Sequence, residues 1–169
     1  MGTSSGASSV SSAGKDTPSL DSLDYVIGSS KSSPKPTETT NVVVFVFWAT
    51  WCRESRSVIS ELNNISAKYK KRNVEFLGIT AEAKTTVEAF QRRKIGRMNF
   101  PCAVDSSGKV ARACCIQKTP TACICDGGKV MWSGDVSKGG LDKAIAVVLH
   151  ERGGRRGVRD DTTKNTKGD

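Results

Sequence analysis

The chain has 169 residues, of which 37% are hydrophobic, and a formal net charge of +9. This length suits one domain, and no apolar run reaches the roughly 20 residues that a membrane-spanning helix needs. The N-terminus lacks the apolar h-region of a secretory signal peptide, so the sequence predicts a cytoplasmic protein that does not bind membranes.

The apolar residues are unevenly distributed along the chain. Residues 1–40 are rich in Ser, Thr, Gly and Pro and hold few residues that could build a core. Such a composition cannot offset the entropy lost on ordering, so this segment is predicted to be disordered. Residues 153–169 are equally polar and are predicted to be a disordered basic tail. Residues 41–152 hold nearly all of the periodic apolar pattern and are predicted to form the single folded domain.

The positive charge belongs mainly to the predicted domain. Residues 41–152 contain 18 Lys and Arg against 10 Asp and Glu, with short basic runs at 68–72 and 92–97. Cations suit the C-terminal ends of helices. Neither run is interleaved with aromatic residues or accompanied by a nucleic-acid-binding motif, so we expect no nucleic-acid partner.

The first predicted elements are a strand, a helix and a second strand. Residues 42–47 (VVVFVF) are β-branched or aromatic without a polar interruption, as in a strand buried on both faces. Apolar residues then recur at helical spacing, at Val58, Leu62, Ile65 and Tyr69. Residues 74–80 (VEFLGIT) are typical of a second buried strand.

A helix, a hairpin and a last helix are predicted to follow. TTVE at 85–88 fits a capping box that would open a helix ending before Gly96. The stretches 122–125 and 129–132 flank the turn DGG and predict a hairpin. Leu141, Ile145 and Val148 mark the final helix. This order predicts an α/β domain whose mixed central sheet is flanked by helices.

The residues between the first strand and helix resemble a known motif. FWATWC, followed by three residues and Arg56, is similar to the form F-W-A-x-W-C-x-x-C-R of the redoxin branch of the thioredoxin superfamily. This branch comprises the TlpA-like and AhpC/TSA-type proteins. FPCAVDSSGKVARACCIQKTPT and CICDGGKVMWSG also have the family's spacing, so the resemblance covers about residues 41–150. It implies a thioredoxin-like fold.

Cys52 is the predicted nucleophile of this motif. It lies at the predicted N-terminus of the first helix, where unsatisfied backbone N–H groups and the helix dipole stabilise a thiolate. Arg53 and Arg56 add positive charge nearby, whereas Glu54 opposes it. The resemblance implies that Arg53 belongs to the substrate-binding surface.

The resemblance also implies the surroundings of the nucleophile. Thr119–Pro120 matches the family's loop with a cis proline, which packs beside the cysteine and lets a substrate backbone pair with the residue before the proline. Trp51 is expected to be exposed recognition surface, and Trp48 to pack under the active-site turn. We expect no cofactor at such a site.

Two residues depart from the family pattern. Ser55 occupies the place of the second, resolving cysteine, so the motif is a monothiol CxxS. A mixed disulfide formed on Cys52 would then need an outside thiol, such as glutathione or a similar small thiol, to release it. Val58 stands where many relatives have a buried carboxylate that helps to move protons.

The five other cysteines are expected to be reduced thiols, because no secretory signal precedes them. Four are interpreted as packing residues: Cys114, Cys115, Cys123 and Cys125. Cys102 is the candidate substitute for the resolving thiol. The CC and CxC spacings differ from the paired CxxC of a zinc ribbon, and the single histidine, His150, is expected at the surface, so no metal site is predicted.

Three functions remain open at this point. The first is a monothiol thiol–disulfide oxidoreductase acting on protein thiols or disulfides through Cys52. The second is a catalytically degenerate module that binds partners through Trp51 and Pro120. The third is a thiol peroxidase, which is ranked last because Phe45 and Ala49 replace the Pro and Thr of the peroxiredoxin signature.

Overall fold

A computed structural model describes residues 13–27 and 41–163, with side chains as far as residue 155. Its strands are β1 (Asp24–Ile27), β2 (Val42–Phe47), β3 (Val74–Thr80), β4 (Cys102–Val104), β5 (Thr121–Asp126) and β6 (Lys129–Asp135). Its helices are α1 (Arg53–Tyr69), α2 (Lys84–Gln91), α3 (Lys109–Ala113) and α4 (Leu141–Thr163), with short 3-10 turns η1 (Lys70–Arg72) and η2 (Val136–Lys138).

The six strands form one mixed sheet in the order β1-β4-β3-β2-β5-β6. Strands β2, β3 and β4 are parallel, whereas β1, β5 and β6 run antiparallel to their neighbours. All six residues of β2 are buried, as the uninterrupted apolar run predicts for a central strand. The thioredoxin-like fold and its mixed sheet flanked by helices are therefore confirmed.

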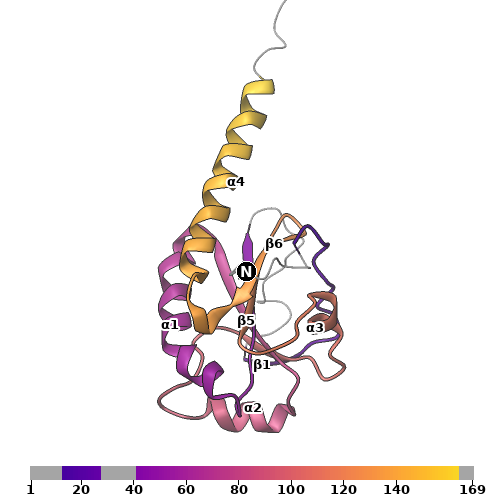
Figure 1. Ribbon diagram of the computed structural model, residues 1–169, viewed down its shortest axis with the longest axis vertical. Coiled ribbons are helices and arrows are strands. Elements are labelled where there is room, and N and C mark those ends of the chain that lie inside the picture. Colours follow the sequence, from indigo (N-terminus) through magenta and orange to yellow (C-terminus); the bar gives the residue numbers. More distant parts are fainter. Residues whose placement is uncertain (1–12, 28–40, 164–169) are drawn as a thin grey trace, which may run out of the picture.

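Side chains alternate across the sheet and build two apolar layers. Val44 and Val46 point into the layer that α1 and α4 cover, which also receives Phe90 of α2. Phe45 points into the opposite layer, which α3 and the N-terminal segment cover and which includes Val110. Figure 1 shows α1 and α3 on opposite sides of the strands, with α2 at the lower end.

The helix α1 follows the predicted stripe, since Val58, Leu62, Ile65 and Tyr69 are all buried. The predicted capping box at 85–88 is wrong. Helix α2 begins at Lys84 with Ala83 as its N-cap, and no side chain caps it. Helix α2 begins two residues after Glu82, whose carboxylate accepts hydrogen bonds from Thr50 and Thr80.

The structure differs from the expected boundary at the N-terminus. Residues 24–27, placed in the disordered segment by composition, form β1 and pair with β4. Leu23 is buried in the same apolar layer as Val110, and the backbone carbonyl of Lys15 accepts a hydrogen bond from the N–H of Val130. A few apolar residues and backbone hydrogen bonds are enough to hold this segment on the domain. The remainder of the predicted disordered segment, 1–12 and 28–40, lies outside the described residues.

The C-terminal boundary also differs, because α4 continues to Thr163 instead of ending near residue 152. Figure 1 shows its last turns extending away from the sheet. Polar contacts hold the middle of this helix. Arg152 and Arg155 approach the carboxylate of Asp126 on β5 to 3.7 and 2.8 Å. Counting apolar residues along the sequence does not reveal these ion pairs. Residues 164–169 lie outside the described part of the chain.

Candidate active site at the N-terminus of helix α1

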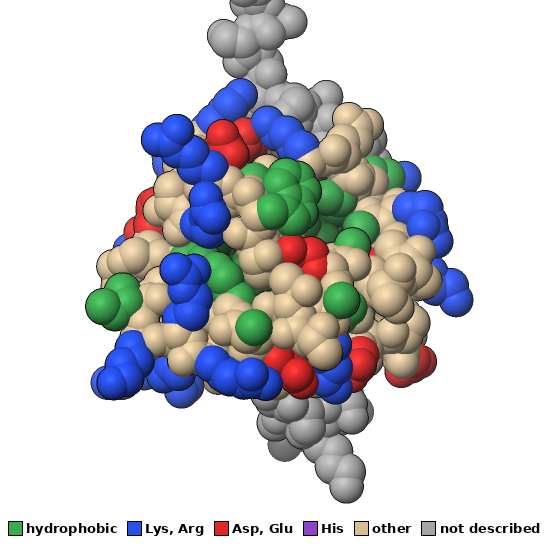
Figure 2. Space-filling view, turned by 90° about the horizontal axis from the view of Figure 1, so that it is seen from below, with side chains coloured by type: hydrophobic (Ala, Val, Ile, Leu, Met, Phe, Trp, Pro, Cys, Tyr) green, Lys and Arg blue, Asp and Glu red, His purple; other side chains and the backbone are tan. Residues whose placement is uncertain are grey.

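Three loops meet at the end of the sheet where Cys52 lies. Phe47, the last residue of β2, pairs with Ile79 near the end of β3 and with Thr121 at the start of β5. The loop after β2, the loop after β3 and the loop before β5 are therefore neighbours. Figure 2 views this end of the molecule, where hydrophobic side chains lie in the middle and many Lys and Arg side chains stand around the margin.

Cys52 is the N-cap residue of α1 and is 6% exposed. Its carbonyl accepts the first helical hydrogen bond, from the N–H of Arg56 at 3.1 Å. Its thiol has one hydrogen to donate and two acceptors within reach, Oε2 of Glu54 at 3.5 Å and the carbonyl oxygen of Thr119 at 3.6 Å. The predicted nucleophile thus lies between a carboxylate and the proline loop.

The carboxylate of Glu54 is ionised over a wide pH range. The hydrogen bond from its own backbone N–H, followed by the one from the Cys52 thiol and the charge of Arg53, holds the pKa of the Glu54 carboxyl below its usual range. Sequence reasoning treated Glu54 only as an opposing charge. Its hydrogen bond with Cys52 makes it the proton acceptor closest to the sulfur among the described side chains.

The proline loop has the geometry that the resemblance implies. The Thr119–Pro120 peptide bond is cis. Pro120 is buried, and its carbonyl accepts a hydrogen bond from the N–H of Val136 at 3.2 Å. This bond fixes the loop against η2, so the carbonyl of Thr119 is held beside the Cys52 sulfur.

Ser55 is fully buried and has a structural contact. Its hydroxyl accepts a hydrogen bond of 3.3 Å from the N–H of Ala49, in the turn that precedes Cys52. Val58 lies one turn further along α1 and is packed in the apolar layer. The described residues therefore bring neither a second thiol nor a buried carboxylate to the positions that hold them in many relatives.

The two tryptophans of the motif have opposite environments, as predicted. Trp51 is 73% exposed beside Cys52, whereas Trp48 is buried and packs on Phe90 with ring centroids 5.3 Å apart. Arg53 is exposed on the first turn of α1. Trp51 and Arg53 are thus exposed on either side of Cys52 in the chain, and the carbonyl of Thr119 lies 3.6 Å from its sulfur.

Sequence reasoning missed Glu82, which supports the active-site turn. Its carboxylate accepts hydrogen bonds from the N–H and the hydroxyl of Thr50, at 2.8 and 2.5 Å, and from the hydroxyl of Thr80 at 3.1 Å. The sequence did contain a signal for this contact, because neighbouring parallel strands end at the same edge of a sheet. A carboxylate placed two residues after β3 therefore meets the turn that follows β2.

Cys102, the candidate substitute for a resolving thiol, lies in an unreactive environment. It is fully buried, and its thiol donates to the sulfur of Met98 and the carbonyl of Phe100. Burial raises the pKa of the Cys102 thiol to about 12. A thiol must ionise to attack, so Cys102 is a poor nucleophile in this conformation.

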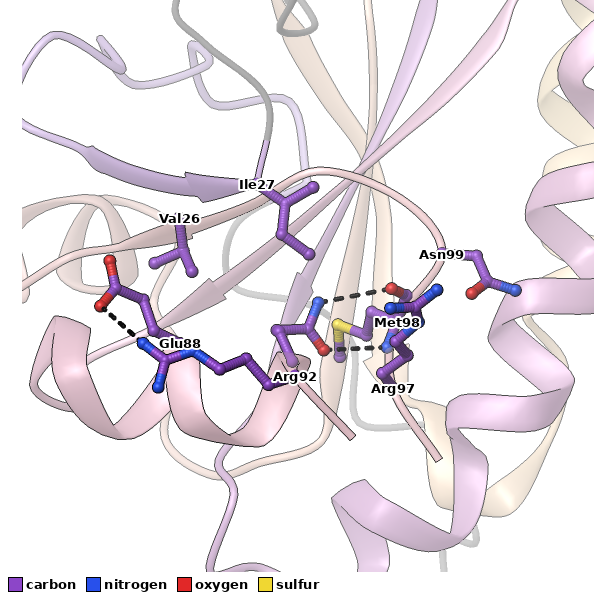
Figure 3. Close-up of a pocket in the computed structure, with 8 residues that line it drawn as sticks. Val26, Ile27, Glu88, Arg92, Arg97, Met98 and Asn99 are labelled. Atoms are coloured by element: carbon purple, nitrogen blue, oxygen red, sulfur yellow. Dashed lines mark hydrogen bonds and ion pairs between the residues drawn. The ribbon is translucent and has the colours of Figure 1, made fainter. Parts of the chain in front are cut away.

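A pocket on this domain lies away from Cys52. It encloses ≈ 630 Å³ between β1, α2 and the loop after it, and Arg92, Arg97 and Ile27 are among its lining residues. Figure 3 shows Arg92 directed at Glu88, and the backbone of Met98 held by two hydrogen bonds with the amide of Gln91. None of the predicted site residues lines it. Among the described residues, no group of three or more potential ligands could hold a metal ion.

Comparison with known proteins gives the family. The AhpC/TSA family pattern matches residues 24–133, from the first residue of β1 to the hairpin. The chain belongs to the AhpC/TSA family. A relative is the "Thiol-disulfide oxidoreductase ResA" of Bacillus thuringiensis, 29% identical over 105 residues. That match covers 60% of this chain and 60% of the relative, so the chain spans less than two thirds of the relative's length.

Solved structures share the fold at lower sequence identity. A putative thiol:disulfide interchange protein DsbE from Chlorobium tepidum superposes with a TM-score of 0.60 at 22% identity, over 81% of this chain and 97% of that chain. Peroxiredoxin Q from Xanthomonas campestris superposes with a TM-score of 0.62 at 15% identity, over 77% and 90%. The fold is common to both kinds of protein, so the site must distinguish between their activities.

Proposed function

We propose that this protein is a thiol–disulfide oxidoreductase that works through the single thiol of Cys52. The observation that carries the proposal is the position of this sulfur. It stands at the N-cap of α1, between Glu54 and the carbonyl of Thr119 beside the cis peptide bond. A relative described as a thiol–disulfide oxidoreductase supports the same reaction class.

The first step is attack by the Cys52 sulfur on a disulfide of a protein substrate. One substrate sulfur becomes bonded to Cys52, and the other leaves as a thiolate. The proton of the Cys52 thiol passes to Glu54, which already accepts its hydrogen bond. Glu54 in this role takes the place of the buried carboxylate that Val58 replaces.

The second step needs a thiol from outside the active site. Ser55 cannot displace the substrate because a hydroxyl does not exchange with a disulfide, and its oxygen is bound to the N–H of Ala49. A small thiol such as glutathione, or a protein thiol, attacks the mixed disulfide and regenerates Cys52. This cycle requires a compartment that supplies reduced thiols, such as the cytoplasm.

The surface around the sulfur suits a protein substrate. Trp51 offers a large apolar contact beside Cys52, and an exposed aromatic residue of this kind is a common anchor in protein interfaces. Arg53 supplies a cation on the same turn, and the backbone of Thr119 is available to an extended substrate chain.

Ser55→Cys tests the assignment. Placing a thiol three residues after Cys52 should create an intramolecular disulfide and allow the protein to reduce insulin with dithiothreitol as electron source. The unchanged protein should instead accumulate a mixed disulfide with glutathione, visible by mass spectrometry. Loss of the Ser55 hydroxyl should cost about 1 kcal/mol of stability, the usual contribution of one hydrogen bond.

Ser57→Cys is the matched control, because Ser57 lies two residues further along α1 and is exposed. It adds a thiol to the same turn without facing the Cys52 sulfur, and should not gain insulin reduction. If Ser55→Cys forms its disulfide but reduces nothing, the oxidoreductase proposal fails. The module that binds partners through Trp51 and Pro120 would then be favoured.

A further inference from the structure

The pocket between β1, α2 and the following loop carries an excess of positive charge. Its charged lining residues are Arg92, Arg97 and Glu88. Arg97 is exposed and belongs to no ion pair within the part of the chain that the structure describes. Arg92 and Glu88 are 4.0 Å apart, and the Arg92 side chain is 78% exposed, so their attraction is weak. Both guanidinium groups are therefore available to an anionic partner.

Two side-chain amides fix the loop that carries Arg97. The amide of the buried Gln91 accepts a hydrogen bond from the N–H of Met98 at 3.0 Å and donates to its carbonyl at 3.3 Å. The amide of Asn63, on α1, accepts from the N–H of Asn99 at 2.9 Å and donates to the carbonyl of Arg97 at 3.0 Å. The backbone on both sides of Met98 is held in place, which lowers the entropy lost when the Arg97 side chain binds a partner.

The same contacts place the pocket beside α1, the helix whose N-terminus carries Cys52. Figure 3 shows Arg97 and Asn99 on the side of the pocket next to this helix, with Glu88 on α2 across from them. From Cys52 to Asn63 the helix rises by ~16 Å. An extended peptide covers this length in about five residues. A substrate bound at Cys52 can therefore reach the pocket with a neighbouring part of its chain.

The loop beside the pocket also exposes a large apolar side chain. Three such side chains are exposed among the described residues: Trp51, Ile95 and Val147. Trp51 adjoins Cys52, whereas Ile95 is 87% exposed and lies between the two arginines in the chain. An exposed apolar side chain among cations suits a protein partner, which brings apolar groups together with its carboxylates, better than it suits a small free anion.

We propose that this pocket is a second docking site, which binds an acidic segment of the protein whose disulfide Cys52 attacks. Carboxylates of that segment accept hydrogen bonds from Arg92 and Arg97, and an apolar side chain of the segment contacts Ile95. The identity of the partner as a substrate rests on the function proposed above. Binding at the pocket holds the disulfide close to the Cys52 sulfur and so raises the rate of attack.

The test uses two peptides that each carry a disulfide to a thionitrobenzoate group. About five residues after this disulfide, one peptide has a run of glutamates and the other has a run of glutamines. Attack by Cys52 bonds its sulfur to the peptide sulfur, and thionitrobenzoate leaves as a coloured thiolate. The unchanged protein should react about fivefold faster with the acidic peptide, as expected for two exposed ion pairs. Salt at about 0.5 M should remove this preference.

Arg92→Ala combined with Arg97→Ala should abolish the preference for the acidic peptide. The matched control combines Lys109→Ala with Arg112→Ala, which removes the same charge from exposed residues of α3, on the opposite face of the sheet. The control should keep the preference. The proposal is overturned if the unchanged protein reacts equally fast with both peptides, or if the control loses the preference as fully as the pocket variant does.

A binding measurement separates this proposal from the function of Cys52. A fluorescein-labelled peptide that has the same run of glutamates and no cysteine should bind the Cys52→Ser protein, measured by fluorescence anisotropy. Adding Arg92→Ala and Arg97→Ala should weaken this binding about fivefold, and equal affinity would overturn the docking site. If neither disulfide peptide reacts faster with the unchanged protein than with Cys52→Ser, the oxidoreductase proposal fails, and the binding measurement still decides whether the pocket holds an acidic segment.

Discussion

Leu23→Ala should destabilise the domain, because Leu23 anchors the N-terminal segment. Its side chain is 8% exposed and packs in the apolar layer beneath α3. Burying a leucine contributes about 1.5–3 kcal/mol, and removing it from a core costs about 2–5 kcal/mol once the cavity is included. The site lies at the margin of the layer and can partly close, so we expect a loss of about 2–3 kcal/mol.

A loss of this size is a large part of the roughly 5–15 kcal/mol that holds a domain folded. It should lower Tm by roughly 8 °C, since about 1 kcal/mol corresponds to a few degrees in a domain of this size. Urea unfolding followed by circular dichroism measures the free energy directly. Ser22→Ala is the control, because it changes the exposed neighbour of Leu23 and should leave the free energy of unfolding unaltered. A change below about 0.5 kcal/mol for Leu23→Ala, the size usual for surface sites, would refute the packing of this segment.

Two further predictions concern the core. Gly78→Ala should lower the free energy of unfolding by about 1–3 kcal/mol, because an added Cβ would lie 2.9 Å from Sγ of Cys102 and 3.1 Å from Nε1 of Trp48. Gly153→Ala is the control, since its Cβ would meet nothing within 4 Å. Equal Tm values for the two variants would contradict this reasoning. Burial raises the pKa of both Cys102 and Cys125 to about 12, so the folded state keeps protons that the unfolded state releases above about pH 8.5. The free energy of unfolding should therefore fall between about pH 8.5 and 12, by up to about 1.4 kcal/mol per pH unit for each thiol. Urea unfolding of the reduced protein at several pH values measures this slope, and Cys102→Ala should make it shallower.

The central part of the fold could be predicted from the sequence because its signals are local and periodic. The uninterrupted apolar run at 42–47 indicates a buried strand, and the apolar residues from Val58 to Tyr69 have the spacing of a helix. Both segments form the expected elements. Strand β1 could not be predicted in the same way. It has four residues and is held by pairing with β4, which is distant in sequence. Its formation depends on a partner that no local pattern reveals.

The candidate site was predictable to the extent that it depends on the motif. The motif placed Cys52, Trp51 and the cis Thr119–Pro120 bond correctly. The hydrogen bonds of Glu54 and Glu82 were not predicted, because a carboxylate in a loop has no periodic signature. Only the folded arrangement of the loops shows that the Glu54 carboxylate reaches the Cys52 sulfur and that the Glu82 carboxylate reaches the turn at Thr50.

The N-terminal segment has a consequence for how the protein behaves in concentrated solution. Without this segment the sheet would have two unpaired strand edges, one on β4 and one on β6, and such edges are templates for pairing with another molecule. β1 covers the edge of β4. Residues 14–17 cover the start of β6, through hydrogen bonds between Gly14 and Val130 and between Thr17 and Gly128.

The same short segment therefore protects both edges, crossing the α3 face of the sheet between them with Leu20 and Leu23 packed against it. A protein shortened to begin at residue 41 would lose both covers at once. Its core would still contain the elements that carry the site, but its exposed backbone N–H and C=O groups could pair with those of a second copy. Self-association, measured by light scattering as a function of concentration, is the expected result of removing a segment whose composition gave no sign of this role.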